Sequence, residues 1–193
     1  KPLMPVANRP LLENIITLLE KHGFNQLILN LYHHAGLIRE HLQSERYQAI
    51  SMNYSLEEEL LGTAGGVKNC EEFLDETFVV ISGDALTDLD LSHLLARHKA
   101  KGALATIALK AEEKVEQFGV VQIDEQGKIL RFQEKPRAHE AVSNLANTGI
   151  YVFETEIFKY IPESRFYDFG RQVFPFLVES KAPFYGVPIA GYW

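Results

Sequence analysis

Apolar and polar positions alternate along the chain with two different periods, and these periods predict its elements. Apolar residues at helical spacing are clearest over 10–21, where Leu11, Ile15, Leu18 and Leu19 share one face. Helices are predicted over 10–21, 36–43, 67–74, 91–101, 155–160 and 169–180. Strands are predicted over 27–31, 47–53, 77–82, 104–109, 120–123, 129–133, 148–153 and 184–188.

The order of these elements predicts an α/β fold. Strands alternate with helices through the first 110 residues, which favours βαβ units and a parallel sheet. The hairpin at 120–133 and the later strands predict an antiparallel addition. In an open α/β sheet, ligands bind beyond the carboxyl ends of the strands. We therefore expect chemistry after Asn53, after Ser82 and after Gln133.

Composition excludes several classes of protein. The 193 residues include 19 Lys and Arg against 26 Asp and Glu, a net charge of −7, which disfavours nucleic-acid polymers as partners. The longest apolar run, 102–109, is too short to cross a membrane. The single cysteine, Cys70, excludes an intrachain disulfide framework and a cysteine-cluster metal site, and is interpreted as a buried small residue.

Two segments carry glycines beside polar groups. Ser82-Gly83-Asp84 ends the strand predicted at 77–82, where a carboxylate suits Mg²⁺ bound together with substrate phosphates; the alternative is a helix cap. Gly62–Gly66 precedes a predicted helix, so its N–H groups could contact an anion or a base; the alternative is a flexible turn. It lacks the Walker and dinucleotide spacings, which disfavours P-loop NTPases and Rossmann dehydrogenases.

Two later segments carry further polar groups. After the hairpin, Lys135 could hold a phosphate and Glu134 could accept hydrogen bonds from sugar hydroxyls, unless both belong to a solvated turn. Asn147-Thr148-Gly149 opens a predicted strand, where the amide could bind a polar ligand or serve only strand entry. Asp168 is interpreted as a helix N-cap, and the histidines as surface or loop residues.

Taken together and in order, seven segments resemble the sugar-1-phosphate nucleotidyltransferase family. They are KPLMPVANRPLLENIITLLEKHG (1–23), LGTAGGVKN (61–69), VVISGDALTDLDL (79–91), FGVVQID (118–124), FQEKP (132–136), ANTGIYVF (146–153), and DFGRQVFPFL through GYW (168–193). The resemblance covers nearly the whole chain. The sequences of the GTAGG and GDALTD motifs are most similar to those of mannose-1-phosphate guanylyltransferases and related glucose-1-phosphate transferases.

The resemblance implies a Rossmann-like, glycosyltransferase-A-like fold: three α/β/α layers around a mixed, mostly parallel sheet. It implies an enzyme of the EC 2.7.7 class that converts an NTP and a sugar 1-phosphate into an NDP-sugar and pyrophosphate, with Mg²⁺ as cofactor. GTP and mannose 1-phosphate are favoured. The alternatives are a glucose-1-phosphate thymidylyl- or uridylyltransferase and a non-catalytic regulatory relative of the same fold.

The resemblance also assigns residues to roles. Asp84 matches a Mg²⁺ aspartate and Lys1 a phosphate-contacting lysine, both catalytic. The residues assigned to the nucleotide are Gly62, Thr63 and Gly65, together with Asp84. The positions around the sugar phosphate are Gly119, Glu134, Lys135 and Asn147, with Lys135 on the phosphate. No nucleic acid or membrane partner is expected, a homo-oligomer is left open, and a cytoplasmic location is expected.

The chain also departs from the family pattern. The Gly-rich loop GGxGTRLxPLT that precedes the Lys1 segment in the family, and the metal aspartate that follows GYW, are not in it. The resemblance therefore predicts that residues 1–193 are a catalytic core without the N-terminal Gly-rich loop, the first strand and the segment after Trp193, inactive alone but part of an active parent. A metal-dependent glycosyltransferase is a further alternative through Asp88-Leu89-Asp90, and the Glu134-Lys135-Pro136 match argues against it.

Overall fold

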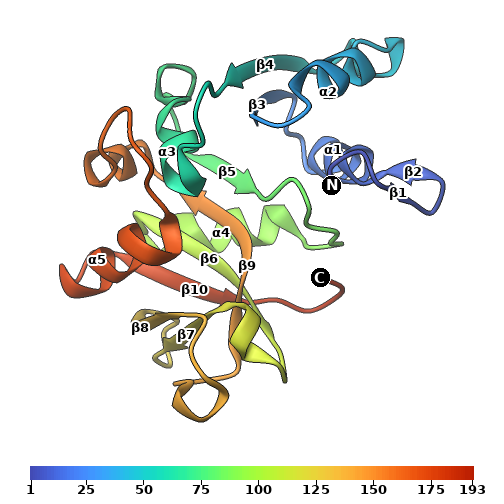
Figure 1. Ribbon diagram of the computed structural model, residues 1–193. Coiled ribbons are helices and arrows are strands. Elements are labelled where there is room, and N and C mark those ends of the chain that lie inside the picture. The colour runs from blue at the N-terminus through green and yellow to red at the C-terminus, as the bar shows by residue number, and fades with distance from the viewer.

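A six-stranded mixed sheet forms the centre of the computed structural model, which describes residues 1–193 (Figure 1). Its strands are β5 (Phe78–Ile81), β6 (Ala105–Ala111), β7 (Gly119–Ile123), β8 (Ile129–Glu134), β9 (Leu145–Phe153) and β10 (Phe184–Pro188). The long strand β9 pairs with β6 along one edge, and with β5 and β7 at opposite ends of the other. Strand β10 extends the sheet beside β6, and β8 extends it beside β7.

The predicted mixed α/β sheet is confirmed, with β9 as the strand that makes it mixed, but its neighbouring strands pair mostly antiparallel rather than mostly parallel. β5, β6, β7 and β10 run in one direction, whereas β9 and β8 run in the other. Because β9 lies between β6 and the pair β5 and β7, β10–β6 is the one parallel pair of this sheet.

Helices cover both faces of the sheet, giving three layers. α4 (Leu91–Lys101) packs Leu91 and Leu94 against Ile150 and Val152 of β9. On the opposite face, α3 (Gly62–Lys68), a π-helical turn (Phe169–Val173) and α5 (Phe174–Glu179) pack against the alternate residues of β9. The period-two alternation of β9 therefore supplies both cores, as a strand buried on two faces requires.

The N-terminal part contributes a second, parallel two-stranded sheet. This sheet consists of β3 (Gln26–Leu31) and β4 (Ser51–Leu56). The same part of the chain contains the hairpin β1 (Pro5–Val6) and β2 (Arg9–Pro10) and the helices α1 (Leu11–Lys21) and α2 (Ala35–Leu42). Leu12 and Ile16 of α1 join a small core with α2 and β3, whereas Leu18 packs into the core beneath α4. Five short 3₁₀ helices complete the chain, at Glu45–Tyr47, Glu71–Phe73, Val115–Gln117, Ala138–Glu140 and Thr155–Tyr160.

The glycine cluster differs from its predicted form. A loop followed by a helix over 67–74 was expected, but the glycines themselves form α3, and only a 3₁₀ turn follows. A Cβ on Gly62 would lie 2.6 Å from the Tyr167 carbonyl oxygen, and one on Gly65 would lie 2.8 Å from that of Arg165. Glycine is therefore required here by close packing against residues 165–167, a tertiary contact that local propensity does not reveal.

Other predictions differ in extent or environment. β4 begins four residues later than the strand predicted at 47–53, and β9 begins three residues earlier than its prediction. The interpretation of all histidines as surface or loop residues is wrong for His98, which is 1% exposed on the inner face of α4 and hydrogen-bonded at both ring nitrogens. Cys70 is buried, as predicted. None of the helices is both long and apolar enough to span a membrane.

Candidate functional site

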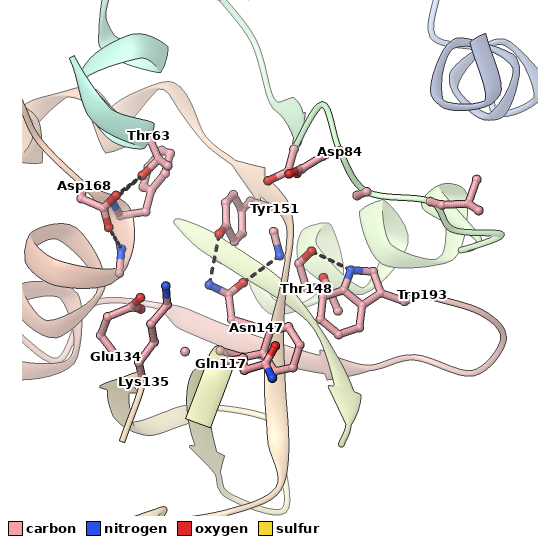
Figure 2. Close-up of a pocket in the computed structure, with 18 of the residues that line it drawn as sticks. Thr63, Asp84, Gln117, Glu134, Lys135, Asn147, Thr148, Tyr151, Asp168 and Trp193 are labelled. Carbon is pink, nitrogen blue, oxygen red and sulfur yellow. Dashed lines mark hydrogen bonds between the residues drawn. The ribbon is translucent and has the colours of Figure 1, made fainter. Parts of the chain in front are cut away.

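A cavity of about 690 Å³ opens over the middle of β9, where the sheet meets the ends of β5 and β8 (Figure 2). Six of the residues predicted from the sequence line it: Thr63, Asp84, Gly119, Glu134, Lys135 and Asn147. They come from segments spread over 85 positions of the chain, which only the sheet brings together. Asp84 follows β5, Lys135 follows β8 and Thr63 lies in the segment after β4, so all three expected places contribute.

Three predicted residues do not line this cavity. Lys1 lies beside it, with its Nζ 3.2 Å from Asp84 Oδ2. Gly62 and Gly65 pack against residues 165–167, and the N–H groups of Ala64 and Gly65 both donate to the Tyr167 carbonyl. Two of the N–H groups expected to be free for an anion or a base are thus already paired within the protein. The roles assigned to these three residues stay predictions.

Asp84 presents a half-exposed carboxylate on one side of the cavity, and Lys1 is its hydrogen-bond partner. No cluster of three or more His, Cys, Asp or Glu side chains is arranged to hold a metal ion. Mg²⁺ commonly binds proteins through one or two carboxylates, completed by substrate phosphates and water. The accessible Asp84 carboxylate at the edge of this cavity fits that mode.

The Asp88-Leu89-Asp90 motif is used structurally. Asp88 accepts a hydrogen bond from the Tyr192 N–H at 2.7 Å, and Asp90 caps α4 by accepting from the His93 N–H at 2.8 Å. Neither aspartate lines the cavity. The hydrogen-bonded Asp90 carboxylate has a lowered pKa, mainly through that bond from His93. These contacts argue against a glycosyltransferase metal motif at this position.

Glu134 and Lys135 enter the cavity together from the end of β8 (Figure 2). Neighbouring residues of a regular strand point to opposite faces. Lys135 breaks the alternation because its φ is +46°, in the left-handed region that a non-glycine residue rarely adopts. Its N–H donates to the Phe118 carbonyl at 3.0 Å, which holds the strained turn. Backbone strain of this kind concentrates at functional sites, because the surrounding structure must maintain it.

The Glu134 carboxylate has no hydrogen-bond donor within the protein. Three charged side chains lie near it: Asp168, Lys135 and Arg171. Partial burial raises its pKa, and the nearby Asp168 carboxylate raises it further. Lys135 and Arg171 oppose these effects. An acceptor without a protein donor, facing a cavity, is suited to hydroxyl groups of a ligand.

The floor of the cavity is a hydrogen-bonded set on β9. The Asn147 amide donates to the Tyr151 hydroxyl at 3.1 Å and accepts from the Gly149 N–H at 3.0 Å. Gly149 has a φ of +76°, and a Cβ there would lie 2.6 Å from Ser82 Oγ. Burial raises the pKa of Tyr151, so its phenol stays neutral. Asn147 therefore sits within β9, held on both sides, rather than at strand entry.

Asp168 is the main site residue that the sequence interpretation missed. It is an N-cap, as predicted: one carboxylate oxygen accepts from the Gly170 N–H at 3.0 Å and the Arg171 N–H at 3.3 Å. The other oxygen accepts from the Thr63 hydroxyl at 3.0 Å, and the carboxylate lines the cavity near Glu134. Nothing in the local pattern distinguishes this cap from an ordinary one, since only the packing of α3 against residues 165–170 places it here.

Tyr151 and Trp193 also line the cavity and were not predicted. The Trp193 indole N–H donates to the Thr148 carbonyl at 2.8 Å, and its ring lies 5.1 Å from that of Phe118. Figure 2 shows Trp193 on the side of the cavity away from Glu134 and Lys135. The cavity therefore offers the Asp84 carboxylate, with Lys1 beside it, and on another side Lys135 with the carboxylates of Glu134 and Asp168. Tyr151 and Trp193 add aromatic surface, an arrangement suited to a ligand with both anionic and hydroxyl groups.

Comparison with known sequences shows the family to which this chain is similar. The family described as Nucleotidyl transferase matches residues 1–193. The chain is 43% identical to the UTP–glucose-1-phosphate uridylyltransferase of Synechocystis over 207 residues, which cover all of the chain and 53% of that protein. It is 30% identical to the mannose-1-phosphate guanylyltransferase of Mycobacterium tuberculosis, covering all of the chain and 54% of that protein. The chain thus spans about half the length of these relatives.

Solved structures share the fold. A UDP-glucose pyrophosphorylase from Acinetobacter superposes with a TM-score of 0.83 at 19% identity, covering 99% of this chain and 79% of that one. HddC from Yersinia pseudotuberculosis, complexed with GMP-PN, superposes with a TM-score of 0.82 at 23% identity, covering 99% and 81%. At these identities the likeness concerns the fold alone.

Proposed function

The chain belongs to the nucleotidyl transferase family, and we propose that the protein containing it transfers a nucleotidyl group from an NTP to a sugar 1-phosphate, releasing pyrophosphate. The observation that carries this proposal is that Asp84 and the Glu134–Lys135 pair, distant in sequence, line one cavity. The chain spans about half of its curated relatives, so the activity is proposed for the natural protein that contains it.

The reaction needs positioning and positive charge more than proton transfer. An oxygen of the sugar phosphate attacks the α-phosphorus of the NTP; a new P–O bond forms, and the bond to the leaving pyrophosphate breaks. The attacking oxygen is already ionised near neutral pH, because the second pKa of a phosphate monoester is about 6. The main obstacle is repulsion between two polyanions, which fixed cations at the site reduce.

Residues on different sides of the cavity bind the two substrates in this proposal. Lys135, held in its strained conformation, provides a cation for the sugar phosphate, and the neighbouring Glu134 accepts from sugar hydroxyls. Lys1 and Asp84 lie together on the nucleotide side. Asp84 would supply the carboxylate for Mg²⁺, which when bound neutralises phosphate charge. Asn147 and Tyr151 form a polar floor in which the Asn147 amide is already hydrogen-bonded to the Tyr151 hydroxyl.

Substrate choice within this class is a finer proposal. The sequences of the GTAGG and GDALTD motifs favour GTP and mannose 1-phosphate. The 43% identity to a uridylyltransferase, against 30% to a mannose-1-phosphate guanylyltransferase, supports UTP and glucose 1-phosphate as the pair to test first. Glucose and mannose 1-phosphates differ in the orientation of one hydroxyl, so the choice depends on which acceptors meet that hydroxyl.

The test is pyrophosphate release by the natural protein, with Mg²⁺ and every combination of four NTPs with glucose 1-phosphate and mannose 1-phosphate. We expect turnover with at least one pair, and its loss on addition of EDTA. An absence of turnover with all pairs would contradict the proposal. If an NDP-sugar still raised the thermal midpoint in that case, the regulatory alternative would be favoured instead.

A further inference from the structure

Two glycines from different elements flank the carboxylate of Glu134. Gly119 begins β7, and Gly170 is the second residue of the π-helical turn. A Cβ on Gly119 would lie 2.6 Å from Phe132 Cζ and 3.1 Å from Glu134 Oε2, and one on Gly170 would overlap that oxygen and lie 3.1 Å from Glu134 Cδ. The carboxylate thus occupies space that a side chain on Gly170 would fill, whereas glycine at position 119 makes room first for the Phe132 ring.

The backbone of Gly170 does not itself require glycine. Its φ is outside the left-handed region in which six other glycines of the chain lie. Glycine is also disfavoured within helical turns, because it loses more conformational freedom than other residues. All three atoms closest to a Cβ at this position belong to carboxyl groups, two to Glu134 and one to Asp168. The missing side chain therefore serves the Glu134 carboxylate rather than the fold.

We propose that Gly170 is a positioning residue for Glu134: its lack of a side chain keeps the Glu134 carboxylate at the cavity wall, where it accepts hydrogen bonds from the hydroxyls of the sugar phosphate. The part of this inference that names the sugar rests on the proposed function. The part that concerns the position of the carboxylate rests on the geometry alone.

The fold can tolerate alanine at position 170. The atoms that its Cβ would displace are at the end of a flexible side chain, so Glu134 can move away without a shift of the backbone. Alanine is also the better helix former. Gly170→Ala should therefore separate ligand recognition from stability, which most substitutions at a buried wall do not do.

The first experiment measures steady-state kinetics of Gly170→Ala in the natural protein. We expect the KM for the sugar 1-phosphate to rise by about tenfold, as for loss of a hydrogen bond to a charged acceptor. The KM for the NTP should stay within about twofold, and the thermal midpoint should be unchanged or higher. Gly36→Ala is the matched control, since Gly36 lies in α2 outside the cavity and a Cβ there meets nothing within 4 Å.

A double-mutant cycle tests whether Gly170 acts through Glu134. Once Glu134→Ala has removed the carboxylate, Gly170→Ala should add no further rise in the KM for the sugar 1-phosphate. Additive effects of the two substitutions would overturn the inference. So would a KM for the sugar 1-phosphate that Gly170→Ala leaves at the wild-type value.

A second readout needs no activity. NMR titration of the Glu134 carboxyl should show a pKa above the ordinary value in the wild type and a lower pKa in Gly170→Ala, because the displaced carboxylate moves away from Asp168. An unchanged pKa would overturn the inference. If the wild type turned over no substrate pair, the proposed function would be wrong, but this titration would still decide whether Gly170 positions Glu134.

Discussion

Thr63 donates a hydrogen bond to Asp168 across 105 residues of sequence, with Oγ1 and Oδ2 3.0 Å apart. The same hydroxyl accepts from the Phe169 N–H at 2.9 Å. Together these bonds fasten α3 to the turn that carries Gly170, the neighbour of Glu134. The link joins the segment predicted to contact the nucleotide to the wall predicted to contact the sugar.

Thr63→Val should weaken this link while keeping the shape of the side chain. It leaves the Phe169 N–H and one Asp168 oxygen without their partner, so we expect the free energy of unfolding to fall by about 1 kcal/mol. Because both sides of the cavity depend on the link, the KM values of both substrates should rise. Urea unfolding and steady-state kinetics measure these effects. Thr155→Val, at a partly buried position outside the cavity, is the control; an equal loss there would show that the effect is not specific to the link.

Asp168→Asn should leave the helix capped but remove a negative charge beside Glu134. Asparagine caps helices as well as aspartate does, so the thermal midpoint should change little. The pKa of Glu134 should fall, because the Asp168 carboxylate contributes to raising it. NMR titration gives the pKa. Asp90→Asn, at the N-cap of α4 outside the cavity, is the matched control and should leave the pKa of Glu134 in place.

Asp84→Asn should lower kcat of the natural protein by about 10²-fold or more, because a neutral amide is a poor ligand for Mg²⁺. The half-exposed side chain bonds only to Lys1, so the fold should be unaffected. Pyrophosphate release over a range of Mg²⁺ concentrations measures the change. Near-wild-type turnover would contradict the role assigned to Asp84, and Asp75→Asn, outside the cavity, controls for the loss of one surface charge.

Lys135→Ala should raise the KM for the sugar 1-phosphate by about tenfold or more, because it removes the cation at the end of β8. It should leave the KM for the NTP close to the wild-type value. Lys114→Ala provides a control lysine that does not line the cavity. Equal rises in both KM values would place Lys135 outside a dedicated sugar-phosphate position.

The buried His98 predicts a pH dependence of stability. Its Nε2 lies 3.0 Å from a Glu154 carboxylate oxygen, so Nε2 carries the proton, and Nδ1 accepts from the Thr106 hydroxyl at 2.8 Å. Burial lowers the pKa of His98, although Glu154 opposes this. The unfolded chain then binds a proton near pH 6.5 that the folded protein does not, so the free energy of unfolding should fall as pH drops below about 6.5.

Urea unfolding over a series of pH values measures this dependence. His98→Gln should reduce it, whereas His139→Gln, at an exposed position, should not. If the slope survived in His98→Gln, the pH dependence would have to come from another group.

Local pattern in the sequence was sufficient for most elements. The apolar spacing of α1 and α4, the continuous run of β5 and the hairpin β7–β8 each appear in the structure close to their predicted bounds. These elements depend on periodicity and turn residues, which are properties of neighbouring positions. The family motifs likewise consist of short contiguous segments, so the sequence was enough to identify the family and to name Asp84, Glu134, Lys135 and Asn147 as candidates.

Relations between distant segments were decided only by the tertiary structure. The position of β9 between β5 and β6, the packing of α3 against residues 165–167, the burial of His98 and the approach of Asp168 to Glu134 all join residues far apart in the chain. Such contacts are set by how the sheet orders its strands and how closely the layers pack, and no local pattern encodes them. The same residue type therefore acts as an isolated helix cap at Asp90 and as a charge on the wall of the site at Asp168.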